Sequence, residues 1–202
     1  ITEDGDIAVL SGSNQYHVSD KVICGGVKIQ KRDLETSDTK GQGSATLKDA
    51  EFEIISLNDN AVLVEGKLYS KNEVVKTILT DIEGVASTSA DLLPYGKYRI
   101  EESKAPEGYL TDGAEPIEFE ITEDGKIVDL TGTDTSIYNQ VKRGDLEGVK
   151  IGAGTHQRLA GVPFRITSKT TGESHIIVTD DNGQFSTSSA WASHKHNTNA
   201  GK

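Results

Sequence analysis

Three side chains that can transfer protons or form bonds occupy positions where apolar side chains are expected. Glu102 ends the run YRIEE on the face of its tyrosine and isoleucine, Lys31 shares the phase of the valine and isoleucine in VKIQK, and Asn139 shares the phase of the isoleucine in SIYNQ. Burying a lone ionised group costs several kcal/mol unless it is paired or neutralised. The sequence therefore predicts that the three groups compensate one another inside the fold.

These three side chains can react with one another. Desolvation can lower the pKa of a buried lysine from about 10.4 to about 5 to 6, which gives a neutral, nucleophilic amine. The same burial favours the protonated form of Glu102, which could donate to the carboxamide oxygen of Asn139 and relay protons while ammonia leaves. Folding would supply proximity equivalent to about 10⁵ to 10⁸ M. The expected product is an amide between Lys31 and Asn139.

Two other interpretations of the triad remain open. It could be a hydrogen-bonded polar cluster in the core with no new bond. It could also act on an external substrate, but the phase places Lys31 and Glu102 beneath a sheet and not in an open pocket. We therefore expect a single-turnover autocatalytic cross-link and no multiple-turnover enzyme.

Short strands must position these residues. The chain has 202 residues, with 21 glycines, only 4 prolines and no amphipathic helical period of useful length, which indicates an all-β protein. Seven or so short strands separated by turns predict an antiparallel β-sandwich. The expected strands span 27–32, 50–57, 61–64, 74–79, 96–102, 117–121 and 136–141.

A first internal repeat concerns the start of the chain. ITEDGDIAVLSG at 1–12 recurs as ITEDGKIVDLTG at 121–132, and each copy is interpreted as a hairpin turn followed by an extended run. After the first copy Tyr16, Val18 and Asp20 share a phase, as Ile137 and Asn139 do after the second, so Asp20 is assigned the place of Asn139. Residues 1–22 are therefore expected to be the closing strands of a preceding domain, or alternatively an N-terminal hairpin.

A second repeat concerns the end of the chain. LAGVPFRI at 159–166 matches LKDAEFEI within the central region, which predicts a complete domain at 23–141 and an incomplete start of a second related domain at 142–202. Lys150 lies near the donor position of that second domain, although Gly148 interrupts its phase. Asp20 and Lys150 could also meet if the two flanking parts complement each other, within one chain or between neighbours.

Several of these segments together resemble a known family. GGVKIQKRD, DAEFEI, LPYGKYRIEESKAPEGY and SIYNQ are similar to the Cna B-type (SpaA-type) immunoglobulin-like, or prealbumin-like, domains of Gram-positive surface proteins and pilins. The specific part is YxIxE followed by APxGY. The resemblance implies a spontaneous isopeptide bond in which Lys31 is the reactive lysine, Glu102 the catalytic glutamate and Asn139 the acceptor.

The predicted function is structural. We expect an extracellular stalk or adhesin domain anchored to the cell wall, stabilised against force and proteolysis by the cross-link and contacting neighbouring domains of the same surface protein and an unidentified host surface ligand. The alternative is a carbohydrate- or host-ligand-binding β-sandwich module of a secreted protein. Only 5% of the residues are aromatic, and Trp191 is interpreted as a packing residue.

Composition argues against other classes of function. The net charge of −11 disfavours nucleic acid and anionic membranes as partners, and no apolar run is long enough to span a bilayer. Cys24 is the single cysteine, which leaves no internal disulfide. His175, His194 and His196 lack a carboxylate partner at ligand spacing, and 180–183 (DDNG) lacks the later ligands of a calcium loop. No metal or cofactor is therefore expected.

Overall fold

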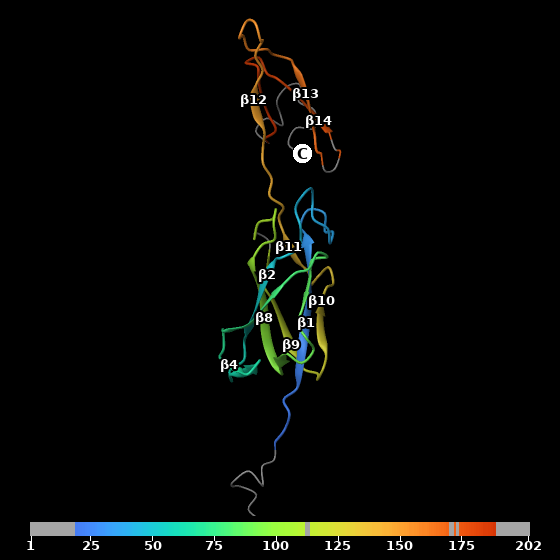
Figure 1. The fold of residues 1–202 in the computed structure, drawn as a ribbon, viewed down its shortest axis with the longest axis vertical. Coiled ribbons are helices and arrows are strands. Elements are labelled where there is room, and N and C mark those ends of the chain that lie inside the picture. Colours follow the sequence, from blue (N-terminus) through green and yellow to red (C-terminus); the bar gives the residue numbers. More distant parts are fainter. Residues whose placement is uncertain (1–18, 112–113, 170–171, 173, 189–202) are drawn as a thin grey trace, which may run out of the picture.

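The computed structural model describes residues 19–111, 114–169, 172 and 174–188, and every regular element in this part of the chain is a strand. Figure 1 shows an elongated molecule in which β1 runs along the long axis and β12 to β14 lie beyond the end where β11 leaves the central sandwich. The strands are β1 (Cys24–Asp33), β2 (Glu51–Ser56), β3 (Val62–Val64), β4 (Lys67–Tyr69), β5 (Val74–Leu79), β6 (Val85–Ser87), β7 (Leu93–Pro94), β8 (Gly96–Lys104), β9 (Ile117–Ile121), β10 (Ile127–Leu130), β11 (Ile137–Asn139), β12 (Glu147–Val149), β13 (Pro163–Thr167), β14 (Ser174–Val178) and β15 (Gln184–Ser186).

Two sheets enclose the main core. One has β1 at its centre, flanked by β10 and β11 and also paired with β6 and β7, and the other has the order β5-β2-β8-β9. The alternating apolar residues of both sheets meet between them, and the core excludes water because these side chains are almost fully buried. Its most buried members are Val27, Ile29, Ala50, Phe52, Ile54, Leu93, Tyr98 and Ile100.

The predicted all-β sandwich is confirmed, but its central strand makes parallel pairs that the sequence analysis did not foresee. β1 pairs in parallel with β10, where Val27 faces Val128, and with β11, where Lys31 faces Ile137. All other ladders are antiparallel. The first strand therefore has the last two strands of the sandwich as its neighbours.

The Glu-Asp-Gly turn near residue 124 does not form the predicted hairpin. β9 pairs with β8 in one sheet and β10 pairs with β1 in the other, so the turn carries the chain across the sandwich. The turn packs tightly on β1: Gly26 donates to the carbonyl of Lys126 at 2.9 Å, and a Cβ at Gly25 would lie 2.7 Å from the same oxygen. The first copy of this motif, at 1–12, lies outside the described residues.

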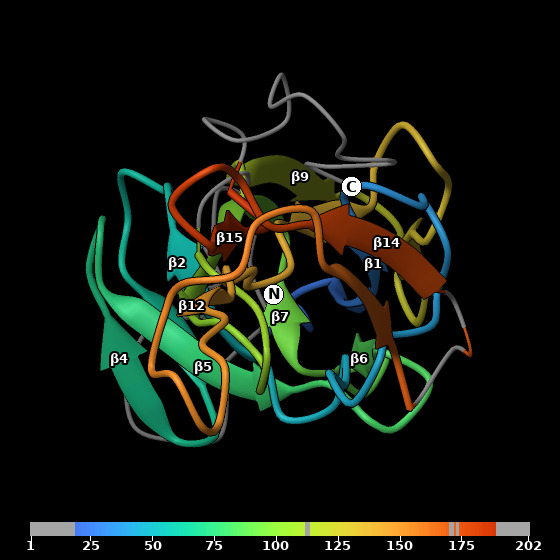
Figure 2. The same ribbon diagram turned by 90° about the horizontal axis from the view of Figure 1, so that it is seen from above.

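Residues after Arg143 form two small antiparallel ladders, β12 with β15 and β13 with β14. The view in Figure 2 places β12 and β15 on one side of this region and β14 on the other. Phe164 and Phe185 stack between the ladders with their ring centroids 4.8 Å apart, and Ile177 is 1% exposed. A small apolar centre therefore joins the two ladders.

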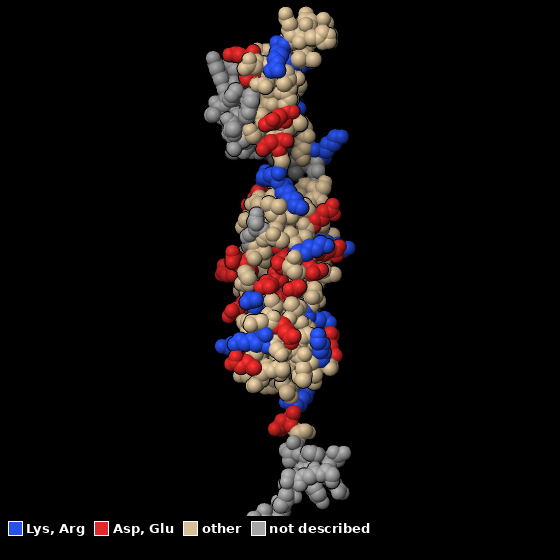
Figure 3. All heavy atoms as spheres, turned by 90° about the vertical axis from the view of Figure 1, so that its left-hand side faces the viewer, with Lys and Arg blue, Asp and Glu red and all other residues tan. Residues whose placement is uncertain are grey.

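Acidic and basic side chains are interspersed along the surface in Figure 3. The described residues contain no helix of the length and apolarity needed to cross a membrane.

Candidate functional site

The fold brings Lys31, Glu102 and Asn139 together in the core. The Nζ atom of Lys31 lies 3.0 Å from Oε1 of Glu102, and both side chains have no exposed surface. The Nδ2 atom of Asn139 donates a hydrogen bond of 2.7 Å to Oε2 of the same carboxylate, and Asn139 is fully buried. Glu102 thus bridges the amine and the carboxamide with its two oxygens.

Neighbouring strands fix the lysine and the asparagine. Because β1 and β11 run in parallel with Lys31 opposite Ile137, Asn139 falls opposite Asp33, one inward-facing position beyond the lysine. The backbone N–H of Lys31 donates to Gly84 on the other side of β1 at 2.7 Å. The strand that carries the lysine is therefore held from both edges.

The glutamate comes from the facing sheet. Glu102 lies on β8 opposite Phe52 of β2, next to an irregularity in the register of these two strands. The ring of Phe52 has its centroid 5.5 Å from the Nζ atom of Lys31. Amine and carboxylate consequently meet in an apolar layer between the sheets.

This environment changes the protonation of the lysine. Burial lowers the pKa of Lys31 to about 8, and attraction to the Glu102 carboxylate offsets part of that effect. The Nζ atom of Lys31 and Oε1 of Glu102 lie at the distance of an ion pair but do not have the alignment of a hydrogen bond. Oδ1 of Asn139 is buried without a hydrogen-bond partner. The carboxamide therefore presents its nitrogen, and not the oxygen assumed in the sequence hypothesis, to Glu102.

Asp33 is a buried charged residue next to the cluster that the sequence analysis missed. It is fully buried on β1 in the phase of Ile29 and Lys31. Burial raises the pKa of the Asp33 carboxyl, but hydrogen bonds from Tyr109, Thr36, Gln42 and Glu35 outweigh burial and hold the pKa below its ordinary value. Extending the alternation of VKIQKRD by one more step would have identified it.

The two further candidates, Asp20 and Lys150, lie outside this cluster. Asp20 is exposed just before β1, at the opposite end of the sandwich from the chain segment that leads to Lys150. Lys150 is half-buried directly after β12, and its N–H donates to Gly183 at 2.8 Å, as that of Lys31 does to Gly84. The local backbone of Lys150 thus reproduces that of Lys31.

The surrounding turns repeat as well. The hydroxyl of Thr80 accepts from Ala50 at 2.9 Å, and the hydroxyl of Thr179 accepts from Val162 at the same distance. Each threonine belongs to a turn whose aspartate accepts two backbone N–H groups; in the second turn Asp180 accepts from positions 182 and 184. Residues 180–183 therefore form a turn, in which the N–H of Gly183 donates to the carbonyl of Asp180 at 2.9 Å. The turn is not a hairpin, because β14 pairs with β13 and β15 pairs with β12.

Metal binding has no support in the described part of the chain, where no group of three or more histidine, cysteine, aspartate or glutamate residues is placed to hold an ion. His194, His196 and Trp191 lie outside the described residues. Cys24 is a free, half-buried thiol.

A family model now accounts for the central sandwich. The model of the SpaA prealbumin-like fold domain matches residues 25–136, and the chain belongs to this family. Its members are structural domains, in agreement with the expectation that the chain is no multiple-turnover enzyme. A comparison with curated proteins gave no match.

Three of the solved structures to which this chain is similar are proteins of Bacillus and Streptococcus. The Bacillus anthracis TIE protein is 23% identical, with a TM-score of 0.52 over 81% of this chain and 26% of that chain. A streptococcal ancillary pilin is 22% identical, with a TM-score of 0.40 over 81% of this chain and 49% of that chain. BcpA, the major pilin subunit of Bacillus cereus, is 28% identical, with a TM-score of 0.38 over 58% and 30%. The chain thus spans about a quarter to a half of the length of these proteins.

Proposed function

We propose that Lys31 and Asn139 become joined by a self-formed isopeptide bond, with Glu102 as the proton carrier. The supporting observation is that one buried carboxylate contacts the attacking nitrogen at 3.0 Å and the leaving nitrogen at 2.7 Å. Water cannot compete in this layer, because all three side chains are buried.

The reaction can be written so that atoms and charges balance. The Lys31 ammonium passes a proton from Nζ to Oε1 of Glu102, and the neutral amine attacks Cγ of Asn139. Glu102 delivers that proton to Nδ2, the bond from Cγ to Nδ2 breaks, and ammonia leaves. The second proton that Nζ loses stays on Glu102, which ends as a neutral acid.

The bond would give the domain a mechanical function. It would link β1, where the chain enters the sandwich, to β11, where the chain leaves it, so tension would pass through covalent bonds and the sheet would not peel. By analogy with a disulfide that closes a loop of about 100 residues, the gain is about 4 to 5 kcal/mol. We infer a stalk or adhesin domain of a Gram-positive cell-wall-anchored surface protein, next to other domains of that protein and able to reach a host ligand.

The flanking regions fit this proposal as neighbouring units. We infer that 23–141 is a complete domain, that 1–22 closes a preceding one and that 142–202 opens a related one whose donor position is Lys150. Limited proteolysis of the full chain should then leave a resistant core near 23–141 and remove 142–202 early. Survival of both flanking regions together, or a cross-link between Asp20 and Lys150, would instead favour complementation between them.

Intact mass measurement tests the cross-link. The folded protein should weigh one ammonia less than its sequence, and a tryptic digest should contain the Lys31 peptide joined to the Asn139 peptide. Lys31→Met should restore the full mass, whereas Lys28→Met, on an exposed position of the same strand, should not. A wild-type protein of unmodified mass would leave only a polar cluster and disprove the proposal.

Ligand binding is a second candidate function. A groove of about 980 Å³ lies at the entry end of the sandwich, and Leu63, Leu68 and Tyr95 line it while more than half exposed. Exposed aromatic and apolar side chains in a groove suit a sugar or peptide ligand. If the groove binds host glycans, Tyr95→Ala should abolish binding, and Ile82→Ala, at an exposed site outside the groove, should not.

A further inference from the structure

Asp33 has more hydrogen bonds than its place in the strand requires. Its Oδ2 accepts from the hydroxyl of Tyr109 at 2.7 Å, and its Oδ1 accepts from the N–H groups of Glu35 and Thr36 at 2.8 and 2.9 Å. The hydroxyl of Thr36 and the amide of Gln42 also donate to the carboxylate. A fully buried charge that accepts this many bonds holds its donors in a single arrangement.

Tyr109 belongs to a segment that pairs with the outer edge of the strand carrying Asn139. Tyr109 forms an antiparallel bridge with Val141, the N–H of Leu110 donates to Gln140 at 2.9 Å, and the N–H of Lys142 donates to Gly108 at 2.8 Å. On the opposite edge, the N–H of Leu34 donates to the carbonyl of Asn139 at 2.9 Å. The residues around Asn139 are therefore held between β1 and the segment 108–110.

We propose that Asp33 and Tyr109 are positioning residues for the cross-link between Lys31 and Asn139. The proposal rests on the proposed function. Asp33 sits two residues beyond Lys31 and directly opposite Asn139, so its bond to Tyr109 ties the donor strand to the segment that braces the acceptor from behind. Among the contacts of the described residues, neither Asp33 nor Tyr109 touches a reacting atom. Their effect is to keep Asn139 in register with the amine of Lys31.

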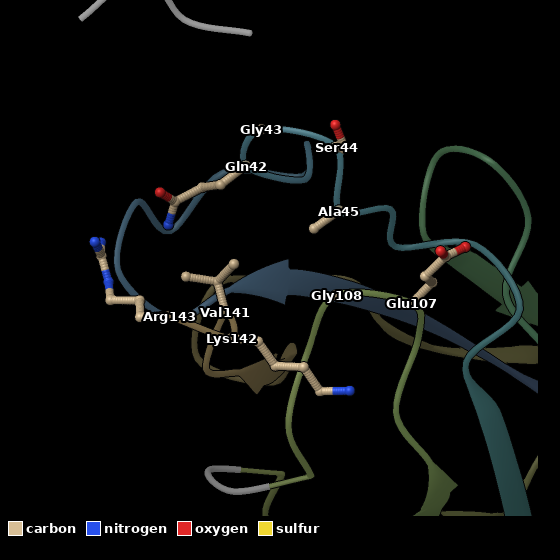
Figure 4. A pocket seen from close by; sticks show the side chains of 9 residues that line it. All are labelled: Gln42, Gly43, Ser44, Ala45, Glu107, Gly108, Val141, Lys142 and Arg143. Carbon is tan, nitrogen blue, oxygen red and sulfur yellow. The ribbon is translucent and has the colours of Figure 1, made fainter. Parts of the chain in front are cut away.

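Adjacent loops extend the same brace toward the chain segment leaving the sandwich. Gln42 donates both to Asp33 and to Glu35, and Glu35 accepts from Arg143 and Gln140. These contacts border a pocket of about 490 Å³ in which Gln42 and Arg143 lie at the same end, as Figure 4 shows. Tyr109 also accepts from the N–H of Gln42 at 3.3 Å, so its hydroxyl is bound from two sides.

Positioning matters because the reaction has no encounter step. Near-attack geometry supplies most of the rate of an intramolecular reaction, and a displacement of about 1 Å can cost about 100-fold. Removing the hydroxyl of Tyr109 leaves the carboxylate of Asp33 short of one strong donor and frees the segment 108–110. The acceptor strand should then sample geometries in which Asn139 is out of line with the amine.

The experiment compares two tyrosines in the full chain. Tyr109→Phe should slow bond formation by about tenfold or more, the effect of losing one hydrogen bond to a charged acceptor. Tyr98→Phe is the matched control, because Tyr98 is equally buried and its hydroxyl bonds a backbone carbonyl, that of Pro94, at 2.8 Å. Chains made in a short cell-free translation pulse are followed by intact mass, and Tyr98→Phe should react at nearly the wild-type rate.

A purely structural role predicts a different pattern. Thermal unfolding of both variants in a Glu102→Gln background, where no bond forms, gives their stabilities without the reaction. The positioning role is disproved if both variants slow bond formation in the same proportion to their losses of stability. It is also disproved if Tyr109→Phe reacts at the wild-type rate. Asp33→Asn leaves one acceptor oxygen for donors that use both carboxylate oxygens in the wild type, so bond formation should slow at least as much as in Tyr109→Phe. A wild-type chain that keeps its full mass would disprove the cross-link itself.

Discussion

The central sandwich and the region after Arg143 repeat the same local structure around a lysine but differ in what covers it. In both regions the backbone N–H of the lysine donates to the carbonyl of a glycine in a turn, Gly84 or Gly183, at 2.7 and 2.8 Å. In the sandwich, β8 of the facing sheet covers that lysine, β11 pairs with its strand, and the lysine is fully buried, whereas Lys150 is half-buried. The position of a donor lysine and its chemical environment are therefore set by different parts of the fold.

The aromatic partners show the same difference. Phe52 is fully buried beneath Lys31, while its counterpart Phe164 is half-buried and stacks on Phe185. Among the described residues, no strand in the second region supplies a carboxylate opposite the lysine. The comparison teaches that the covering strands are what turn an ordinary strand lysine into a candidate nucleophile.

The largest expected effect separates the covered lysine from its counterpart. Glu102→Gln should leave the sandwich folded but unreacted, because the amine and carboxamide lose their proton carrier, and should lower its Tm by roughly 20 °C. Unfolding of the region after Arg143 should not change. Calorimetry together with intact mass measures both.

Glu101→Gln is the control for that experiment. Glu101 precedes the proposed proton carrier, has a side chain 34% exposed and pairs with Arg99 at 3.1 Å. Exposed pairs contribute about 0 to 1 kcal/mol, so this variant should react fully and keep nearly the wild-type Tm. Bond formation at the wild-type rate in Glu102→Gln would show that Glu102 is structural.

A smaller effect concerns pH. In an Asn139→Ala variant no bond forms, and Lys31 keeps its amine. The pKa of this amine is about 8 in the folded state and 10.5 in the unfolded state, so between pH 8 and pH 10.5 the unfolded state binds more protons. Stability should therefore rise with pH across this range, and the deficit relative to the bonded wild type should shrink by up to about 3 kcal/mol. Denaturant unfolding at pH 8 and pH 10.5 measures the deficit. A constant deficit would show that burial does not disfavour the charged lysine.

The smallest effect tests whether the two lysine turns are equivalent. Gly84 and Gly183 have φ values of 74° and 68°, where an alanine costs about 1 to 2 kcal/mol. A Cβ at either position would also lie 3.2 or 3.0 Å from the carbonyl of the corresponding lysine. We expect similar losses in Gly84→Ala, measured by unfolding in the Glu102→Gln background, and in Gly183→Ala, measured by amide exchange at Lys150. A loss confined to Gly84→Ala would break the equivalence.

The sequence by itself determined the fold class and the identity of the central triad. Period-two alternation identified the inward positions of β1, β8 and β11, and a charged or amide side chain at such a position is conspicuous because burial is costly. The interpretation failed where the period was not followed far enough, as at Asp33, and where a turn was taken for a hairpin, as at residue 124. The short strands β4, β6 and β7 were not predicted, because alternation over two or three positions carries little signal. β3 and β11 are equally short but were found within longer expected strands, 61–64 and 136–141.

Only the tertiary structure decided which strands are neighbours and which atoms meet. Alternation reports the face of a residue but not its partner strand, so the parallel pairing of β1 with β11 could not be inferred from it. That pairing places Asn139 next to β1, and the facing sheet then brings Oε1 and Oε2 of Glu102 to the amine and the amide nitrogen. The lowered pKa of Lys31 also follows from tertiary structure, since desolvation depends on the strands that cover a side chain and not on its neighbours in sequence.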